Sequence, residues 1–114
     1  MSNARVFLPV RANNHDPAPA TKFGPLVVLL ERAPHFLNCA DVVGQAVSAA
    51  ERLGYDPDVD LLALTGPQTC VNLVAMALFA RFGHLRILVW DARAADGRGE
   101  YRDRLVRAPS GAAA

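Results

Sequence analysis

The sequence lacks several features that would place it in large protein classes. Two cysteines, Cys39 and Cys70, fit neither a disulfide framework nor a four-ligand zinc site. The longest uninterrupted apolar run, residues 73–80, is far shorter than the roughly 20 residues that cross a bilayer. No basic segment followed by an apolar one marks a signal peptide at the N-terminus. We therefore expect a cytoplasmic protein with free thiols and no membrane span.

Excess charge of either sign is also missing. Lys22 and 11 arginines face 11 acidic residues, which leaves a net charge of +1. This balance argues against an acidic DNA mimic and against nucleic-acid binding through overall charge, although a local basic patch stays open. Of the 114 residues, 52% are hydrophobic and 20% are charged, as in ordinary globular proteins. We expect one domain over residues 1–107 and a disordered, low-complexity tail over 108–114.

Apolar patterning predicts an α/β fold, a mixed sheet of about five strands with two helices. Residues 5–10 contain β-branched and aromatic side chains, but Pro9 cannot donate a ladder hydrogen bond, so an edge strand or a short leading strand is expected. Residues 11–21 are rich in proline and asparagine and predict a surface loop. The continuous apolar run of residues 24–30 predicts a strand covered on both faces.

Two helices come after this strand in the sequence. Asn38 is a candidate N-cap for a helix that ends near Leu53, before Gly54. A second helix, from Pro67 to Phe82, is apolar nearly all round and is expected to pack on more than one side. The first helix should bury one stripe of residues spaced three or four apart: Val42, Val43, Ala46, Val47, Ala50 and Leu53.

The second helix is flanked by two short apolar runs, residues 61–65 and 85–91, which predict buried strands. Two such strands joined by a helix predict a central parallel β-α-β crossover. Beyond them, an Asp-Gly turn signal within residues 92–99 and a polar strand over 100–106 predict a C-terminal hairpin at the sheet edge.

The turn between the first of these strands and the helix is the first candidate binding site. Its residues Thr65, Gly66, Gln68 and Thr69 offer hydroxyl groups and backbone N–H groups at a helix N-terminus, which attract phosphate or carboxylate. The turn is not a P-loop, because the lysine and second glycine are missing and Pro67 removes one donor. An ordinary crossover turn without a ligand is the alternative.

A second candidate is His15 with Asp16, in the predicted loop over residues 11–21. These two side chains could form an acid-base pair near the turn at Thr65 to Thr69. No second histidine lies at metal-ligand spacing, so a solvated turn is the alternative. Asp56, Asp58 and Asp60 resemble the opening of a calcium loop, but the glycine and glutamate that such a loop needs are missing, so a plain turn is expected. No catalytic residue, metal or cofactor is predicted.

The C-terminal hairpin carries a cluster of cationic and aromatic residues: Arg93, Arg98, Tyr101, Arg102 and Arg104. The arginines could contact phosphates while Tyr101 stacks on a base. Acidic residues interleave with the arginines and nearly cancel their charge. A solvated edge that discourages pairing between sheets, or a protein-binding edge, is therefore the alternative.

Short motifs run along the chain in a recognisable order. They are Val6-Phe7, Asn14-His15-Asp16, Lys22-Phe23-Gly24, Phe36-Leu37-Asn38, Asp60-Leu61-Leu62, Thr65-Gly66, Asn72, Phe82-Gly83-His84-Leu85, Leu88-Val89-Trp90-Asp91 and Tyr101. Their order over about residues 5–106 resembles a family of small α/β proteins of unknown function encoded by tailed bacteriophages, with a longer insertion at Ala94 to Arg98. The resemblance implies a phage-encoded accessory protein in the host bacterial cytoplasm and transfers no catalytic residue.

Three functions remain open from the sequence. The first is a non-enzymatic module that binds a phage or host protein through the sheet edge or the hairpin, with a homodimer as one form of it. The second is a nucleotide or phosphate binder, including a nuclease of a signalling nucleotide, that uses the turn at Thr65 to Thr69. The third is nucleic-acid binding through the arginine hairpin. The first is favoured, because no set of acid, base and nucleophile appears in the sequence.

Overall fold

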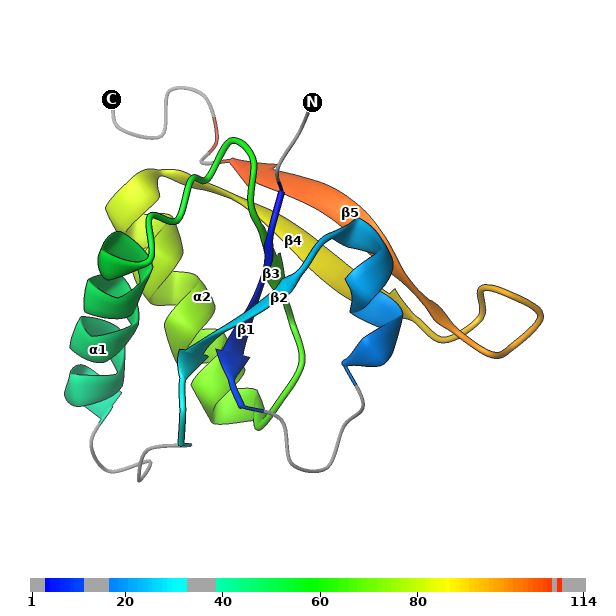
Figure 1. Cartoon of the computed structure of the whole chain (residues 1–114), viewed down its shortest axis with the longest axis horizontal. Helices are drawn as coiled ribbons and strands as arrows, with labels where there is room; N and C mark the ends of the chain where they lie inside the picture. The colour runs from blue at the N-terminus through cyan, green and yellow to red at the C-terminus, as the bar shows by residue number, and fades with distance from the viewer. Residues whose placement is uncertain (1–3, 12–16, 33–38, 108, 110–114) are drawn as a thin grey trace.

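Four apolar segments and the polar C-terminal strand pair into one five-stranded sheet of order β2-β1-β3-β4-β5 (Figure 1). The computed structural model describes residues 4–11, 17–32, 39–107 and 109. Strands β1 to β4 are parallel, and β5 runs antiparallel to β4. The predicted α/β class, the central crossover and the C-terminal hairpin are confirmed. The elements are β1 Val6–Val10, 3-10 helix η1 Ala18–Phe23, β2 Leu26–Leu30, α1 Cys39–Arg52, β3 Leu61–Ala63, α2 Gln68–Phe82, β4 His84–Asp91 and β5 Glu100–Arg107.

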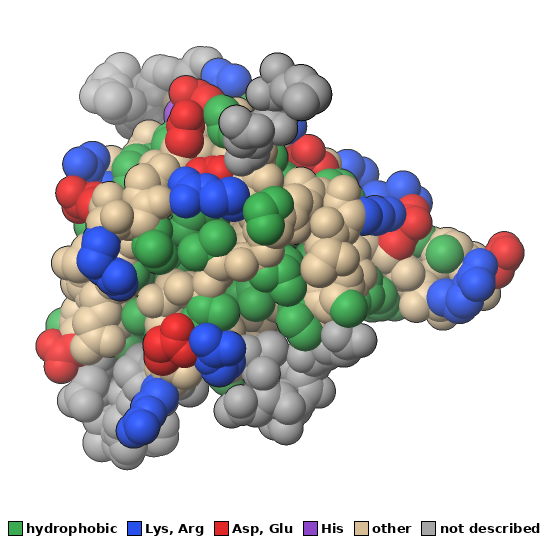
Figure 2. Space-filling model, in the orientation of Figure 1, with side chains coloured by type: hydrophobic (Ala, Val, Ile, Leu, Met, Phe, Trp, Pro, Cys, Tyr) green, Lys and Arg blue, Asp and Glu red, His purple; other side chains and the backbone are tan. Residues whose placement is uncertain are grey.

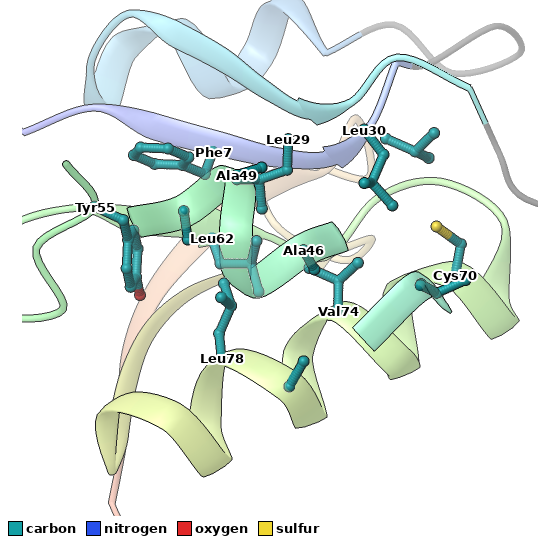
Figure 3. Close-up of a cluster of buried hydrophobic side chains, with 14 of the residues drawn as sticks. Phe7, Leu29, Leu30, Ala46, Ala49, Tyr55, Leu62, Cys70, Val74 and Leu78 are labelled. Carbon is teal, nitrogen blue, oxygen red and sulfur yellow. The ribbon is translucent and has the colours of Figure 1, made fainter. Parts of the chain in front are cut away.

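Two apolar layers form because successive strand residues point to opposite faces of the sheet. On one face, Phe7 and Leu62 pack under α1 and α2 together with Val74 and Leu78 (Figure 3). On the other face, a smaller cluster lies around η1: Val6, Leu8, Ala20, Leu61, Ala63, Leu88 and Tyr101. Within the described part of the chain, no helix is long and apolar enough to cross a membrane.

The first strand lies inside the sheet, between β2 and β3, so the predicted edge position was wrong, whereas the alternative of a short leading strand agrees with the five residues of β1. All five of its residues are buried. Pro9 is tolerated there because β3 is only three residues long and pairs with β1 at Val6 and Phe7. Pro9 lies beyond the last of these pairs, where β3 no longer needs a donor from β1.

Strand β2 lies at the sheet edge, and Leu26, Val27 and Val28 are half-buried, so the predicted cover on both faces is incomplete. The prediction of a surface loop over residues 11–21 was wrong for the last four of these residues, because η1 begins at Ala18. Residues 12–16, the candidate cap Asn38 and residues 108 and 110–114 lie outside the described residues. The loop, the cap and the disordered tail stay predictions there.

The two α-helices end where the sequence predicts. Gly83 takes a left-handed conformation with φ of 87° and donates its N–H to the Phe79 carbonyl, which ends α2. The buried stripe of α1 consists of Val42, Ala46, Ala49 and Ala50, whereas Val43 is exposed. The inclusion of Val43 in the predicted stripe was therefore wrong, whereas Val47 and Leu53 are partly buried and pack against the core as predicted.

Arg5 and Asp60 tie the ends of three elements together. The Asp60 side chain is 3% exposed, and its carboxylate accepts hydrogen bonds from Arg5 N at 3.0 Å, Arg5 Nη2 at 3.0 Å and Asp56 N at 2.8 Å. The Arg5 guanidinium also donates to the carbonyl oxygens of Leu53 and Gly54, both at 2.8 Å. One buried carboxylate thus joins the start of β1, the chain after α1 and the residue before β3. The predicted turn at Asp56 to Asp60 is confirmed, and Asp60 is its structural centre.

Tyr55 is expected to tolerate, or to gain from, the loss of its hydroxyl group. The ring packs edge-on against Phe7 and Phe82, with centroids 5.2 and 5.1 Å away. The buried hydroxyl has no hydrogen-bond partner among the described residues, and burial raises the pKa of Tyr55 with help from Asp60 and Asp56. Tyr55→Phe keeps the ring contacts and removes a desolvated polar atom, so the free energy of unfolding in urea should stay equal or rise by up to about 1 kcal/mol. A loss above about 1 kcal/mol would contradict this prediction.

Candidate functional site

An apolar groove of about 450 Å³ lies between α2 and the hairpin of β4 and β5. The Met76 side chain is 66% exposed above it, whereas Leu85 is buried at its floor. Helix α1 packs against β2, and α2 packs against β1 and β4, so β5 borders the groove on this face of the sheet. The prediction that α2 is packed on more than one side is confirmed, because α2 contacts both α1 and the sheet. Its groove side, however, lacks a cover among the described residues. The lining residues are Leu64, Ala75, Met76, Phe79, Ala80, Leu85, Ile87 and Val106.

The rim of the groove along β5 is cationic. Val106 lies opposite Leu85 and Arg104 lies opposite Ile87 in the ladder, and directly opposite residues share one face of the sheet. Arg104 therefore lies beside the apolar floor. Its Nη1 donates to the Asp103 carbonyl oxygen at 2.7 Å, and it forms no ion pair with a described carboxylate. The groove thus combines an apolar floor with an arginine available at one side.

The predicted turn from Thr65 to Thr69 lies at the carboxyl ends of the parallel strands. The strand order reverses here, because β1 continues to β2 on one side while β3 continues to β4 on the other. Open α/β sheets often bind ligands at such a point. Gly66 has φ of 128°, and a Cβ there would lie 3.3 Å from a Val10 methyl group, so the turn packs closely on β1. Gln68 and Thr69 are exposed, and Gln68 donates to Asn72.

Two side chains beside these strand ends neutralise one another. Arg11 comes directly after β1 and Glu31 directly after β2, with Nε and Oε2 at 2.7 Å. The hydrogen bond from Arg11 lowers the pKa of Glu31, and the same bond raises the pKa of Arg11. Because the charges of Arg11 and Glu31 cancel, this pair does little to attract an anion to the strand ends. His15 and Asp16 lie outside the described residues, so their place near the turn stays a prediction.

The chemistry available elsewhere is limited. Within residues 4–11, 17–32 and 39–107, no three His, Cys, Asp or Glu side chains gather closely enough to hold a metal ion. Cys70 is buried, and its burial raises the pKa of the thiol. A raised pKa keeps a thiol protonated and weakly nucleophilic at neutral pH.

The sequence model of one protein family, described as Phage Pam3 gp32-like protein, matches residues 5–103. The match includes every helix, strands β1 to β4 and the first half of β5. The chain belongs to this family. The resemblance to phage proteins is thereby confirmed, and a phage origin is the consequence. No curated protein and no solved structure matches the chain.

In this member of the family, the hairpin offers a different aromatic residue from the predicted one. Tyr101 is 6% exposed and packs edge-on under Trp90, which is 43% exposed. A base could therefore reach Trp90 more readily than Tyr101. Arg102 pairs with Asp91 and Glu100, whereas Arg93 and Arg98 are exposed near the turn. Contact of these arginines and Arg104 with nucleic acid stays a prediction.

The groove is the feature that sequence reasoning missed in this family member. Seven of its eight lining residues lie within the matched range, and Val106 lies just beyond it. The available signal was a helix apolar nearly all round in a chain that predicts only one other α-helix. One sheet and one neighbouring helix cannot cover every side of such a helix. An uncovered apolar side was therefore inferable.

Proposed function

We propose that this phage accessory protein is a non-enzymatic protein-binding module, and that the groove beside α2 binds an amphipathic helix of a phage or host protein in the bacterial cytoplasm. The observation that carries the proposal is the open apolar groove, at which Met76 is 66% exposed. Exposed apolar patches of this kind mark interaction surfaces in soluble proteins.

The position of the groove favours a helix as its occupant. Helices cover the faces of parallel sheets in α/β folds, and here α1 and α2 lie side by side on one face (Figure 1). The groove lies where a third helix would continue this layer over β4 and β5. A partner helix with apolar residues at positions i, i+3, i+4 and i+7 would complete it.

The lining of the groove favours a protein over a small molecule. Small-molecule sites place a few polar groups among apolar ones to orient the ligand. The eight lining side chains here carry no hydroxyl, amide or charged group. An apolar stripe of a helix needs no such group, and Arg104 at the rim favours an acidic residue on the flank of that helix.

The substitution Met76→Glu is expected to reduce partner capture at least tenfold. Burial of a methionine side chain contributes about 1.5–3 kcal/mol, and about 1.4 kcal/mol corresponds to a factor of ten in affinity. The immobilised full chain is used to capture proteins from lysate of phage-infected cells. Each captured protein is then purified, and its affinity for the unmodified chain and the variant is measured by calorimetry.

Val43→Glu is the matched control, because Val43 is an apolar helix residue that is 37% exposed on α1. Circular dichroism must show that both variants are folded. The proposal requires a partner that binds the unmodified chain and Val43→Glu equally and contributes a segment that becomes helical on binding. Equal affinity for Met76→Glu, or equal losses in both variants, would overturn the groove as the binding site.

A further inference from the structure

The outer edge of β2 has no partner strand among the described residues, and its sequence lacks the features that usually shield an edge strand. In the described part of the chain, β1 is the one neighbour of β2 in the sheet. Its five residues, Leu26–Leu30, include no charge and no proline. Edge strands in natural proteins are usually shielded by charges, proline or bulges, because their unpaired N–H and C=O groups accept another strand. The opposite edge, β5, carries five charged residues and conforms to this rule.

The surface around β2 is apolar with a charged border. In the view of Figure 1, β2 lies in front of the other strands, and Figure 2 shows hydrophobic side chains gathered over this region with charged side chains around them. Arg11 and Glu31, which directly follow β1 and β2, form an exposed ion pair at one end of the strand. An apolar strip bounded by charges is typical of an interaction surface.

A hollow flanks the edge on each face of the sheet. One, of about 460 Å³, lies between β2 and the flank of α1 and includes Leu29, Gln45 and Ser48 in its lining. The other, of about 390 Å³, includes Leu26 and Val28. An added strand points its side chains alternately to the two faces. Both hollows would therefore receive side chains from a strand paired with β2.

We propose that a second copy of the chain adds its β2 to this edge, antiparallel, with Val28 opposite Val28 of the second copy. In that register Leu26 lies opposite Leu30 and Val27 lies opposite Leu29, so all five cross-strand pairs are apolar. The strand is therefore self-complementary, as a two-fold interface requires.

Neighbouring registers fit less well. A centre at Leu29 would place the charged Glu31 and Arg32 opposite apolar residues. A centre at Val27 would place Gly24 and Pro25 opposite Leu30 and Leu29, where Pro25 offers no N–H. Apolar cross-strand pairs contribute to sheet stability, so the register centred on Val28 is the preferred one.

The backbone directions agree with this register. The Pro25 carbonyl accepts from Val6 N at 2.8 Å, on the β1 side. Successive residues of a strand point their N–H and C=O groups to opposite sides, so Val27 and Leu29 also face β1, while Val28 faces outward. The Val28 N–H and C=O groups can then pair with those of Val28 in the second copy.

The full chain, of 12.2 kDa, is expected to form a dimer in sedimentation velocity runs over a concentration series. Val28→Lys should raise the dimer dissociation constant at least tenfold, because the two introduced ammonium groups would lie opposite each other. Leu105→Lys, at a 48% exposed position on the β5 edge, should leave the constant unchanged. A chain that is monomeric at every concentration, or equal dissociation constants for Val28→Lys and the unmodified chain, would overturn the proposal.

Amide hydrogen exchange on the unmodified chain gives a second test that does not depend on a variant that folds. The Val28 amide should exchange faster when the protein is diluted below its dimer dissociation constant. The Val27 and Leu29 amides should keep their protection, since they bond to β1. Exchange of Val28 that does not change with concentration would contradict the proposal. The groove beside α2 lies toward the other edge of the sheet, so a monomeric variant should still bind the partner helix.

Discussion

Asp60→Ala is expected to lower the free energy of unfolding by about 3–4 kcal/mol. Removal of one partner of a fully buried ion pair costs about 3–5 kcal/mol, and the lower part of this range applies because the Arg5 side chain is 30% exposed. The substitution removes an acceptor that serves two backbone N–H groups, those of Arg5 and Asp56, as well as the Arg5 guanidinium. A buried donor left without a partner costs about 1–3 kcal/mol. Urea denaturation followed by circular dichroism measures the loss.

Asp58→Ala is the matched control for this prediction. Asp58 lies two residues away in the same turn, and its side chain is 79% exposed beside His84. Exposed ion pairs contribute little, so the free energy of unfolding should change by less than about 1 kcal/mol. Equal effects of the two substitutions would show that Asp60 contributes no more than a surface carboxylate. Asp60→Asn should fall between them, because an amide oxygen still accepts from one backbone N–H.

The helices and the hairpin could be predicted because their signals are local. Pro67 and Gly83 bound α2 on either side, and each acts through its own backbone conformation. The Asp-Gly signal at residues 96–97 lies in the connection between β4 and β5, where both residues have positive φ. Such signals depend on neighbours in sequence, so they are readable without the fold.

The order of the strands could not be predicted, because it depends on contacts between distant residues. Pro9 argues for an edge by itself, yet the short β3 leaves room for it inside the sheet. The apolar run of β2 argues for an interior strand, yet β2 lies at the edge. In both cases the length and position of a different strand determined where the strand lies in the sheet.

The same limit applied to the candidate sites. The turn at Thr65 to Thr69 was found because any crossover places a turn at the strand ends. The groove was missed because its existence depends on the element after β4. That element is an antiparallel strand instead of another helix, so no described residue covers the side of α2 near Met76. Likewise, Asp60 looked like one of three turn aspartates until Arg5, 55 residues away in sequence, was placed beside it.

Gly24→Ala is expected to destabilise the protein by about 3 kcal/mol. Gly24 has φ of 152° and ψ of 175°, a conformation that is essentially restricted to glycine. A Cβ at this position would also overlap the Ala4 carbonyl oxygen, which belongs to the backbone leading into β1 and cannot rotate away. Backbone strain and steric overlap each cost about 1–3 kcal/mol, so the substitution must displace η1, the start of β1 or both.

Gly44→Ala is the control for this prediction, because the same glycine-to-alanine change should have the opposite effect on stability there. Gly44 lies on the exposed surface of α1, and a Cβ there meets no atom within 4 Å. Alanine favours the helix over glycine by about 1 kcal/mol, so the free energy of unfolding should rise by about 0.5–1 kcal/mol. Urea denaturation of both variants should thus move in opposite directions from the unmodified chain. A Gly24→Ala variant as stable as the unmodified chain would contradict the prediction. It would mean that the connection between η1 and β2, and the edge strand β2 itself, can shift to accommodate a Cβ atom.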